Sequence, residues 1–321
     1  MKNRKKLFGV IALIAVIGLC FAACGGKSKS KSKGSSGKSG GVTWTAVEKT
    51  TAFDYKPKGR TYKSDIWAIA YGKDKFVAVG RNSNMAYLSD GVKWSAIPGG
   101  AKYGDPGQST FGEDAYINAI VYGNNKFVAG GMFGRMAYSS DGVKWTAIPG
   151  GDYVSDPGQS TFEYTDIDAI AYGNNKFVAG GVGKMAYSSD GVKWTAVTDS
   201  KFDNYGITAI VYGNNKFVAV RGGGQMAYST DGVKWTVVTD SPFTDIIESI
   251  VYAKDKFVAG GRGQMAYSSD GVTWTATVEP AAFDYKSGGS TYKANIRAIA
   301  YGKDKFVAVG DKGIIAYSTG E

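Results

Sequence analysis

The side chains that could do chemistry in this 321-residue chain are carboxylates and tyrosines, because the sequence contains no histidine. That absence excludes mechanisms built on a Ser-His or Cys-His pair, and it removes the commonest metal ligand. A pair of carboxylates could instead act as acid and base on a glycosidic bond. Four acidic residues stand in loops where such a pair would lie: Asp105, Glu113, Asp156 and Glu163. Nothing in the sequence sets the distance between any two of them.

Loop tyrosines form a second group of candidates. Flat rings among scattered carboxylates and amides suit the recognition of a carbohydrate or a peptide. Each ring can also be explained as packing within its own loop. The ligand-binding candidates of this kind are Tyr55, Tyr62, Tyr103, Tyr153, Tyr164, Tyr205, Tyr285 and Tyr292.

These loops are held by six copies of one repeat. The unit begins with Ile-x-Ala-Ile-x-Tyr, which is followed by a hairpin turn such as Gly-Asn-Asn and then by Lys-Phe-Val-Ala-x-Gly. It continues with Met-Ala-Tyr-Ser, an Asp-Gly turn and Lys-Trp-Thr. The units start near residues 66, 117, 167, 207, 247 and 296. Periods of about 40–50 residues built from short strands are typical of propeller blades. The sequence therefore predicts an all-β, six-bladed β-propeller of four-stranded blades over residues 41–321.

The two ends of the domain complement each other. The sixth unit stops after its third strand, near Tyr317, and the missing Trp strand stands alone at Gly41–Val47. A strand from the N-terminus that completed the last blade would close the ring and cover its free edge. We therefore expect residues 41–47 to close the ring.

The turn Ser-Ser-Asp-Gly-Val-Lys-Trp resembles the Asp-box of BNR-repeat propellers, although it is one residue shorter between Asp and Gly. That family includes sialidases, sortilin-type receptors and a photosystem assembly factor. The resemblance covers essentially all of 41–321 and implies a structural role for the aspartate, which can accept backbone N–H groups within its own turn. The Asp-box aspartates are Asp90, Asp141, Asp190, Asp231 and Asp270.

Variation between the repeats is confined to one end of the predicted ring. Turns after strands one and three are near-identical, whereas connections after strands two and four differ, as expected of a binding surface on a rigid scaffold. Neutral drift in exposed loops is the alternative explanation. The second-to-third strand connections also carry four candidate arginines: Arg81, Arg135, Arg221 and Arg262.

Three functions remain open for this end of the ring. A sialidase-like glycoside hydrolase would hold a substrate carboxylate with three arginines. The four candidate arginines of this chain stand instead at repeat-equivalent positions where other blades carry Lys or Asp. A scaffold or assembly factor would be expected to carry a basic groove. We favour a non-catalytic propeller that binds a glycan or protein ligand, with no catalytic residue, no cofactor and no metal.

The N-terminus predicts export and lipidation. A basic start to Lys6 is followed by 17 uncharged residues, Leu7–Ala23, and then by Cys24-Gly-Gly. This pattern resembles the lipobox of bacterial lipoprotein signal peptides, with Phe21 where leucine is usual. The resemblance implies a signal peptide at 1–23 and lipid attachment at Cys24. Residues 24–40, rich in Lys, Ser and Gly, are expected to form a flexible tether, with the propeller at the cell surface or the periplasmic face.

The net charge of +10 does not indicate a nucleic-acid partner. Nine of the 38 basic residues and none of the 28 acidic ones lie in residues 1–40, which leaves 29 basic against 28 acidic residues in the domain. A nucleic-acid-binding protein carries its basic excess on the folded surface. We therefore expect no nucleic-acid partner.

Overall fold

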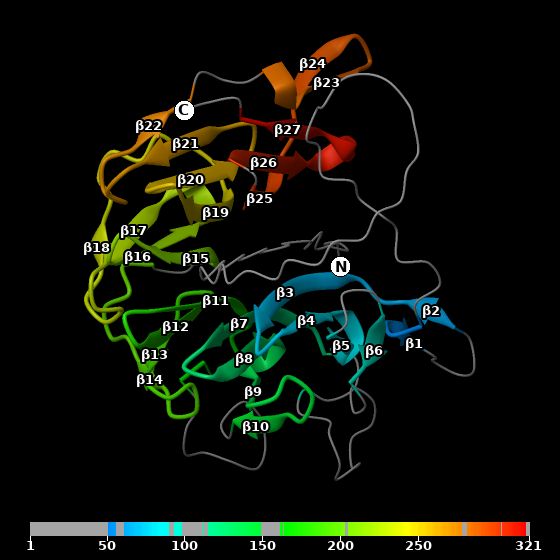
Figure 1. The fold of residues 1–321 in the computed structure, drawn as a ribbon. Helices are drawn as coiled ribbons and strands as arrows, with labels where there is room; N and C mark the ends of the chain where they lie inside the picture. The colour runs from blue at the N-terminus through cyan, green and yellow to red at the C-terminus, as the bar shows by residue number, and fades with distance from the viewer. Residues whose placement is uncertain are drawn as a thin grey trace, which may run out of the picture.

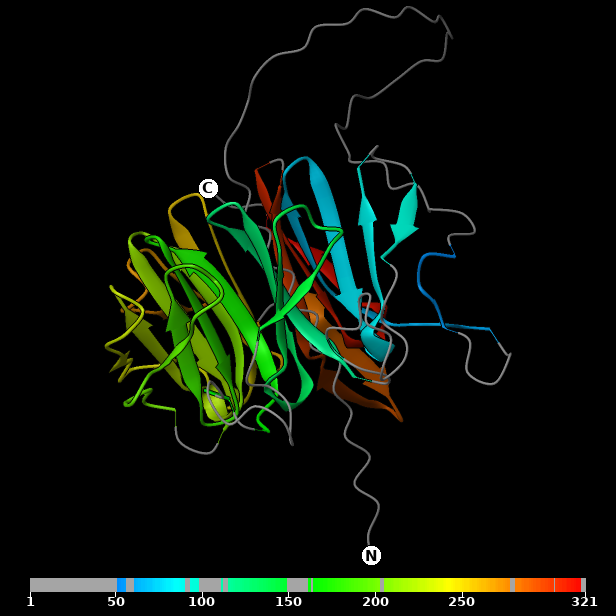
Figure 2. The same cartoon turned by 90° about the horizontal axis from the view of Figure 1, so that it is seen from below.

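The computed structural model describes residues 51–55, 61–89, 93–97, 111, 115–148, 161–162, 164–202, 205–277, 281–302 and 304–318. Within these residues the chain forms a series of antiparallel sheets arranged around a common centre, in chain order from blue to red (Figure 1). In each blade the first strand lies nearest the centre. Figure 2 shows the strands of neighbouring blades running side by side. The prediction of an all-β, six-bladed propeller is confirmed.

Each blade is a meander of consecutive strands. Blade one consists of β3 (Ile66–Gly72), β4 (Lys75–Gly80), β5 (Met85–Leu88) and β6 (Trp94–Ala96), and blade two of β7 (Ile117–Gly123), β8 (Lys126–Gly131), β9 (Met136–Ser139) and β10 (Thr146–Ile148). Blade three consists of β11 (Ile167–Gly173), β12 (Lys176–Gly181), β13 (Met185–Ser188) and β14 (Thr195–Ala196), and blade four of β15 (Ile207–Gly213), β16 (Lys216–Arg221), β17 (Met226–Ser229) and β18 (Thr236–Val237). Blade five consists of β19 (Ile247–Ala253), β20 (Lys256–Gly261), β21 (Met265–Ser268) and β22 (Thr275–Ala276), and blade six of β25 (Ile296–Gly302), β26 (Lys305–Gly310) and β27 (Ile315–Tyr317).

Two segments that lead into first strands form hairpins, which the repeat pattern did not predict. They pair β1 (Asp54–Tyr55) with β2 (Tyr62–Lys63) and β23 (Asp284–Ser287) with β24 (Ser290–Lys293). Short 3-10 turns also join strands two and three or precede a hairpin. They are η2 (Arg81–Ser83), η3 (Met132–Gly134), η4 (Gly222–Gly224), η5 (Ala281–Phe283) and η6 (Asp311–Gly313).

The hydrophobic core lies between successive blades rather than at the centre. Val77 and Val79 of blade one pack with Ile117, Ile120 and Phe127 of blade two, and all five are at most 3% exposed. The same arrangement recurs between the next pairs of blades. This packing explains the continuous apolar pattern of the first strands, since both faces are covered.

At the junctions between blades one to five, a tyrosine of the following blade packs on the last glycine of the preceding first strand. A Cβ atom added at Gly173 would lie 2.0 Å from the ring of Tyr212, and one at Gly123 would lie 2.1 Å from that of Tyr172. Only a residue without a side chain leaves this space. The glycine therefore sets the distance between neighbouring blades.

The junction between blades five and six departs from this rule, because Ala253 stands where the others carry glycine. Polar contacts join the two blades there instead. Lys254 Nζ lies 2.8 Å from a carboxylate oxygen of Asp304, and the Ile299 N–H donates to the Ser249 hydroxyl at 3.1 Å.

The Asp-box turns show why the motif repeats. The Asp190 carboxylate accepts the N–H groups of Val192 and Lys193, each at 2.8 Å, and the Ser188 hydroxyl accepts the Gly191 N–H. Burial raises the pKa of Asp190, but these hydrogen bonds outweigh it and hold the pKa below its usual range. Asp141, Asp231 and Asp270 make the same contacts, and Asp90 lies outside the described residues.

Successive blades are also joined at the end of the ring where these turns lie, which we call the Asp-box end. The Lys126 ammonium donates to the Asp190 carbonyl at 2.9 Å, and Asn124 donates to the Ser189 carbonyl at 3.2 Å. Turns after strands one and three therefore share one end, as expected. The 3-10 turns meet the segments that lead into the first strands at the opposite end, for example where Met132 N–H donates to the Tyr116 carbonyl. We call this the loop end.

Apolar side chains remain exposed on the first and last blades. Phe76 is 41% exposed, whereas its equivalents Phe127 and Phe177 are fully buried, and Ile315 on β27 is 70% exposed where Met226 is buried. The strand expected to close the ring, at 41–47, lies outside the described residues.

We predict that Gly173→Ala forces blades three and four apart, because the new methyl group would overlap the Tyr212 ring. Overpacking of this kind costs about 1–3 kcal/mol of unfolding free energy. Thermal and urea unfolding followed by circular dichroism measure it. Gly222→Ala is the control, because its Cβ would meet nothing closer than 3.8 Å. Equal stability of both variants would show that the glycine does not set the spacing.

Candidate functional site

One position of the repeat differs in every blade. The first strands all begin with Ile, and the residue after it is the one place where six near-identical strands carry six different side chains. We call this set the inner ring. Its members are Trp67, Asn118, Asp168, Thr208, Glu248 and Arg297.

Each inner-ring residue sits at a break in strand pairing. The register between the first and second strands shifts across this residue in all six blades, as between Ile167 and Ala169. Such a bulge leaves one residue unpaired and re-aims its side chain, and bulges are common beside functional sites. The ring lies near the start of the strands closest to the centre, at the loop end.

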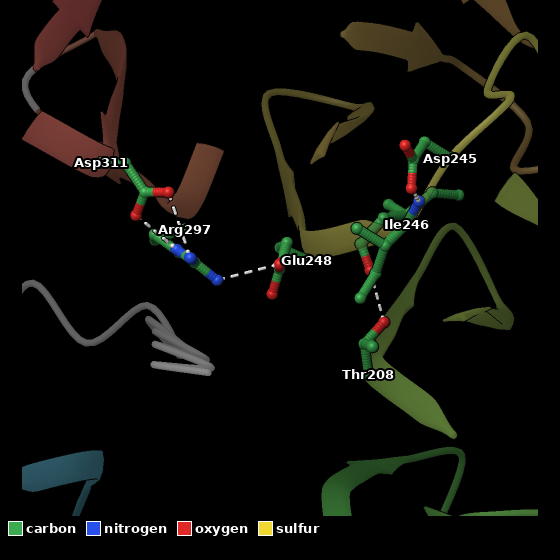
Figure 3. A network of polar contacts seen from close by, with 7 residues as sticks. Thr208, Asp245, Ile246, Glu248, Arg297 and Asp311 are labelled. Carbon is green, nitrogen blue, oxygen red and sulfur yellow. Dashed lines mark hydrogen bonds and ion pairs between the residues drawn. The ribbon is translucent and has the colours of Figure 1, made fainter. Parts of the chain in front are cut away.

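Blades five and six are joined at the ring by a charged network. Arg297 donates to both oxygens of Asp311, at 2.8 and 3.1 Å, and its third contact is with Glu248 Oε1 at 2.9 Å (Figure 3). The Glu248 side chain is 5% exposed and its second oxygen, Oε2, has no hydrogen-bond partner among the described residues. Burial raises the pKa of Glu248, Arg297 lowers it, and Asp311 and Asp245 raise it further, so that the pKa lies above its ordinary value.

Thr208 continues the ring from blade four to blade five. Its hydroxyl lies within hydrogen-bonding distance of the carbonyl oxygens of Val220, at 3.1 Å, and Ile247. Figure 3 shows this contact beside Asp245 and Ile246. Thr208 is 8% exposed, so this part of the ring is covered by its neighbours.

Asp168 is the second carboxylate of the ring. The Asn118 amide of the preceding blade donates to its Oδ1 at 3.0 Å. Burial raises the pKa of Asp168 to about 7, with a further contribution from the Asp166 charge, while the Asn118 hydrogen bond opposes the change. The carboxyl therefore changes charge near neutral pH.

The four candidate arginines lie at the loop end, and each contacts groups close to it. Arg81 lies 4.0 Å from Asp65 and 5.5 Å from the Tyr116 ring centre, and Arg262 lies 3.2 Å from Asp245. Arg135 donates to the Phe111 carbonyl, while Arg221 donates to Gln225 and lies 4.4 Å from the Tyr205 ring centre. The described contacts do not bring three arginines onto one acceptor.

The tyrosine candidates divide into three groups. Tyr164 and Tyr205 are each 57% exposed and lie before the first strands of blades three and four. Tyr285 and Tyr292 face each other across the β23–β24 hairpin, with ring centres 5.6 Å apart. Tyr55 and Tyr62 are likewise opposite in the β1–β2 pair, though their side chains lie outside the described residues, as do Tyr103 and Tyr153 altogether.

Sequence reasoning missed the inner ring, although the signal was present. Asp168, Glu248 and Arg297 stand in the first strand of the repeat. This strand is otherwise so uniform that its sequence indicates only a structural role. The loop carboxylates considered as an acid/base pair, Asp105, Glu113, Asp156 and Glu163, lie outside the described residues, as does the lipidation candidate Cys24.

The described residues carry no group of three or more Cys, Asp or Glu side chains that could hold a metal ion. In the same residues no helix is both long and apolar enough to span a membrane. The inner ring thus offers charged and hydrogen-bonding groups without a metal cluster.

Comparison with solved structures places this geometry among known propellers. The chain resembles YCF48 in fold. YCF48 from Cyanidioschyzon merolae matches with a TM-score of 0.54 and 18% identity over 80% of this chain and 83% of that one. YCF48 bound to a D1 peptide matches with a TM-score of 0.55 and 16% identity over 83% and 80%. No protein-family model matches the sequence, and no curated protein matches it.

We predict that Asp168→Asn stabilises the protein most at pH 8 and progressively less as the pH falls towards 4. A carboxyl whose pKa is raised contributes stability below its unfolded pKa, and this contribution is lost as pH rises through the folded value of about 7. The substitution keeps the Asn118 contact and removes the charge. The rise in pKa from 3.8 to about 7, at 1.36 kcal/mol per pKa unit, corresponds to a gain of up to about 4 kcal/mol in unfolding free energy at high pH. Melting temperatures of both proteins from pH 4 to 9 measure the difference.

Asp255→Asn is the control for this titration, because it removes one charge in an exposed turn where three other blades carry asparagine. If Asp168→Asn and wild type kept a constant difference in melting temperature over the whole pH range, the buried carboxyl would not titrate near neutrality.

Proposed function

We propose that this chain is a non-catalytic propeller that binds a segment of another protein at the loop end, with the inner ring deciding which segment is accepted. The observation that carries the proposal is the inner ring itself. Six strands that are otherwise near-identical present six different side chains at one bulged position. Packing does not require this difference, because the residues on either side remain the same in nearly every blade.

The surroundings of the ring support recognition rather than catalysis. The exposed tyrosines Tyr164 and Tyr205 lie in the segments that lead into the ring strands β11 and β15, and aromatic rings are common anchors in protein interfaces. The candidate arginines lie on four different blades, and each is engaged by a different acceptor. An arginine triad of the sialidase type would need three of them on one substrate group.

The fold comparison adds a precedent for the ligand class. The YCF48 structure with a bound D1 peptide shows that a propeller of similar fold can hold a peptide. A protein ligand is therefore favoured over a glycan in this proposal. We further propose, from the sequence of the leader, that the propeller is exported and attached to a membrane through lipid on Cys24.

Site-specific photo-crosslinking in the native cell tests which end of the ring meets the partner. A benzophenone amino acid is placed at Tyr164 or Tyr205 on the loop end, and at Lys193 or Lys234 on the Asp-box end, in the full chain. We expect one discrete protein adduct from the loop-end positions, because the ligand lies within reach of them. Gel electrophoresis and mass spectrometry of the adducts give the readout.

The Lys193 and Lys234 derivatives are the matched controls, since both residues are exposed and repeat-equivalent. Adducts formed only from the Asp-box end would overturn the proposed orientation. If the full chain bound to a glycan array and no position gave a protein adduct, the ligand would be a carbohydrate rather than a protein.

A further inference from the structure

The Glu248 carboxylate of the inner ring has one buried oxygen without a donor among the described residues. Its side chain is 5% exposed, its Oε1 accepts the Arg297 N–H, and its Oε2 is buried with no partner in the described part of the chain. A buried charged oxygen without a donor costs more free energy than most single contacts restore. In Figure 3 this oxygen points towards the middle of the ring. Among the described residues, none donates to Glu248 on this inner side.

The groups around Glu248 favour a donor that carries positive charge. Asp311 and Asp245 both add negative potential at this carboxyl, and Arg297 is its one cationic neighbour among the described groups that shift its pKa. Arg297 is already shared with Asp311 through two hydrogen bonds. An N–H donor on a cation forms shorter and stronger hydrogen bonds with a carboxylate than a neutral donor does.

Asp168 places a second carboxylate on the ring, two blades away from Glu248 with only the neutral Thr208 between them. In the described part of the chain, the groups that bond to Asp168 or shift its pKa are the amide of Asn118 and the carboxylate of Asp166, neither of which is cationic. The Asn118 Oδ1 atom is also buried and has no partner among the described residues. The inner-ring positions of blades two to five thus offer acceptors and no cation.

A metal ion fits this arrangement less well than an organic cation. Calcium and magnesium take six or more oxygen ligands, and the described residues hold no group of three or more acidic or cysteine side chains placed to bind a metal ion. A primary ammonium or a guanidinium needs only a few acceptors and reaches a recessed site on a long side chain.

We propose, resting on the protein-binding function above, that the inner ring receives the ammonium or guanidinium group of a lysine or arginine side chain, with Glu248 as the primary acceptor and Asp168 as a second acceptor. The ring then acts as the specificity determinant of the loop end. Acidic and apolar side chains leave Glu248 Oε2 without a donor, and neutral polar side chains offer only an uncharged, weaker one.

Saturation-transfer NMR with the full chain at about 150 mM salt tests the proposal, since that ionic strength screens exposed charges beyond about 8 Å. The probes are acetylated Gly-Ser-Lys-Ser-Gly and the same peptide with arginine, acetyl-lysine or glutamate in place of lysine. We expect dissociation constants at least tenfold lower for lysine and arginine than for acetyl-lysine. Affinity should rise from pH 6 to pH 8 as Asp168 loses its proton.

The variant Glu248→Gln with Asp168→Asn should weaken lysine binding at least tenfold. Its matched control is Asp74→Asn with Asp255→Asn, which removes two charges at the Asp-box end by introducing the residue that other blades carry there. The control should bind lysine peptide as wild type does. Circular dichroism confirms that both double variants are folded.

Equal binding of lysine and acetyl-lysine peptides, or equal loss of binding in both double variants, would overturn the inner-ring proposal. Loop-end crosslinks would leave the protein-binding function standing in that case, so the two failures are distinguishable. Preferential lysine binding that the ring variant abolishes supports the proposal.

The chain's own tether is a second source of the same chemistry, because residues 27–33 alternate lysine and serine. Replacing Lys27, Lys29, Lys31 and Lys33 by glutamine distinguishes the sources. A rise in peptide affinity would identify the tether as a competing occupant, and an unchanged affinity would identify the partner's side chain as the occupant.

Discussion

The contact on which the ring depends is that between a tyrosine of one blade and the backbone of the blade before it. Tyr122, Tyr172, Tyr212 and Tyr252 each lie over a glycine that leaves no room for a Cβ atom. This contact brings the apolar faces of neighbouring sheets together, and the core forms between them. The Asp-box turns then join each blade to the next through side chains such as Lys126. Nearly every repeated residue is accounted for by one of these contacts.

The same constraint explains where the blades are free to differ. Residues of the repeated pattern fit the neighbouring blades in the same way at successive junctions, whereas the bulged second residue of each first strand makes a different contact in different blades, such as Asn118 with Asp168 or Glu248 with Arg297. Its substitution leaves the Tyr–Gly contact and the Asp-box turn unchanged. Chemistry can therefore vary at Asp168, Thr208 or Glu248 without loss of the fold, and a rigid scaffold holds the variable groups in fixed positions.

The fold was predictable because its signals are local and repeated. The period, the Asp-Gly turns and the apolar first strands are enough together to indicate a six-bladed propeller. The site was predictable only in part. The bulge that turns Glu248 and Arg297 to the centre comes from a register shift that alternation along a strand does not reveal, and the Glu248–Arg297 contact joins residues 49 positions apart. The sequence also places Tyr285 and Tyr292 in a loop, whereas they lie in the β23–β24 hairpin. Pairing between two segments this short depends on a register that the residue pattern does not reveal.

In the proposed function, the protein ligand is recognised at the inner ring and not at the repeated Asp-box turns. Hydrogen–deuterium exchange of the full chain, with and without saturating lysine-containing peptide, tests it most directly because each end of the ring has its own backbone amides. We expect slower exchange in the segments that begin β11, β15, β19 and β25 and in η6, with no change in the Asp-box turns at 139–145 and 188–194. Slower exchange confined to the Asp-box turns, with the first strands unaffected, would contradict it.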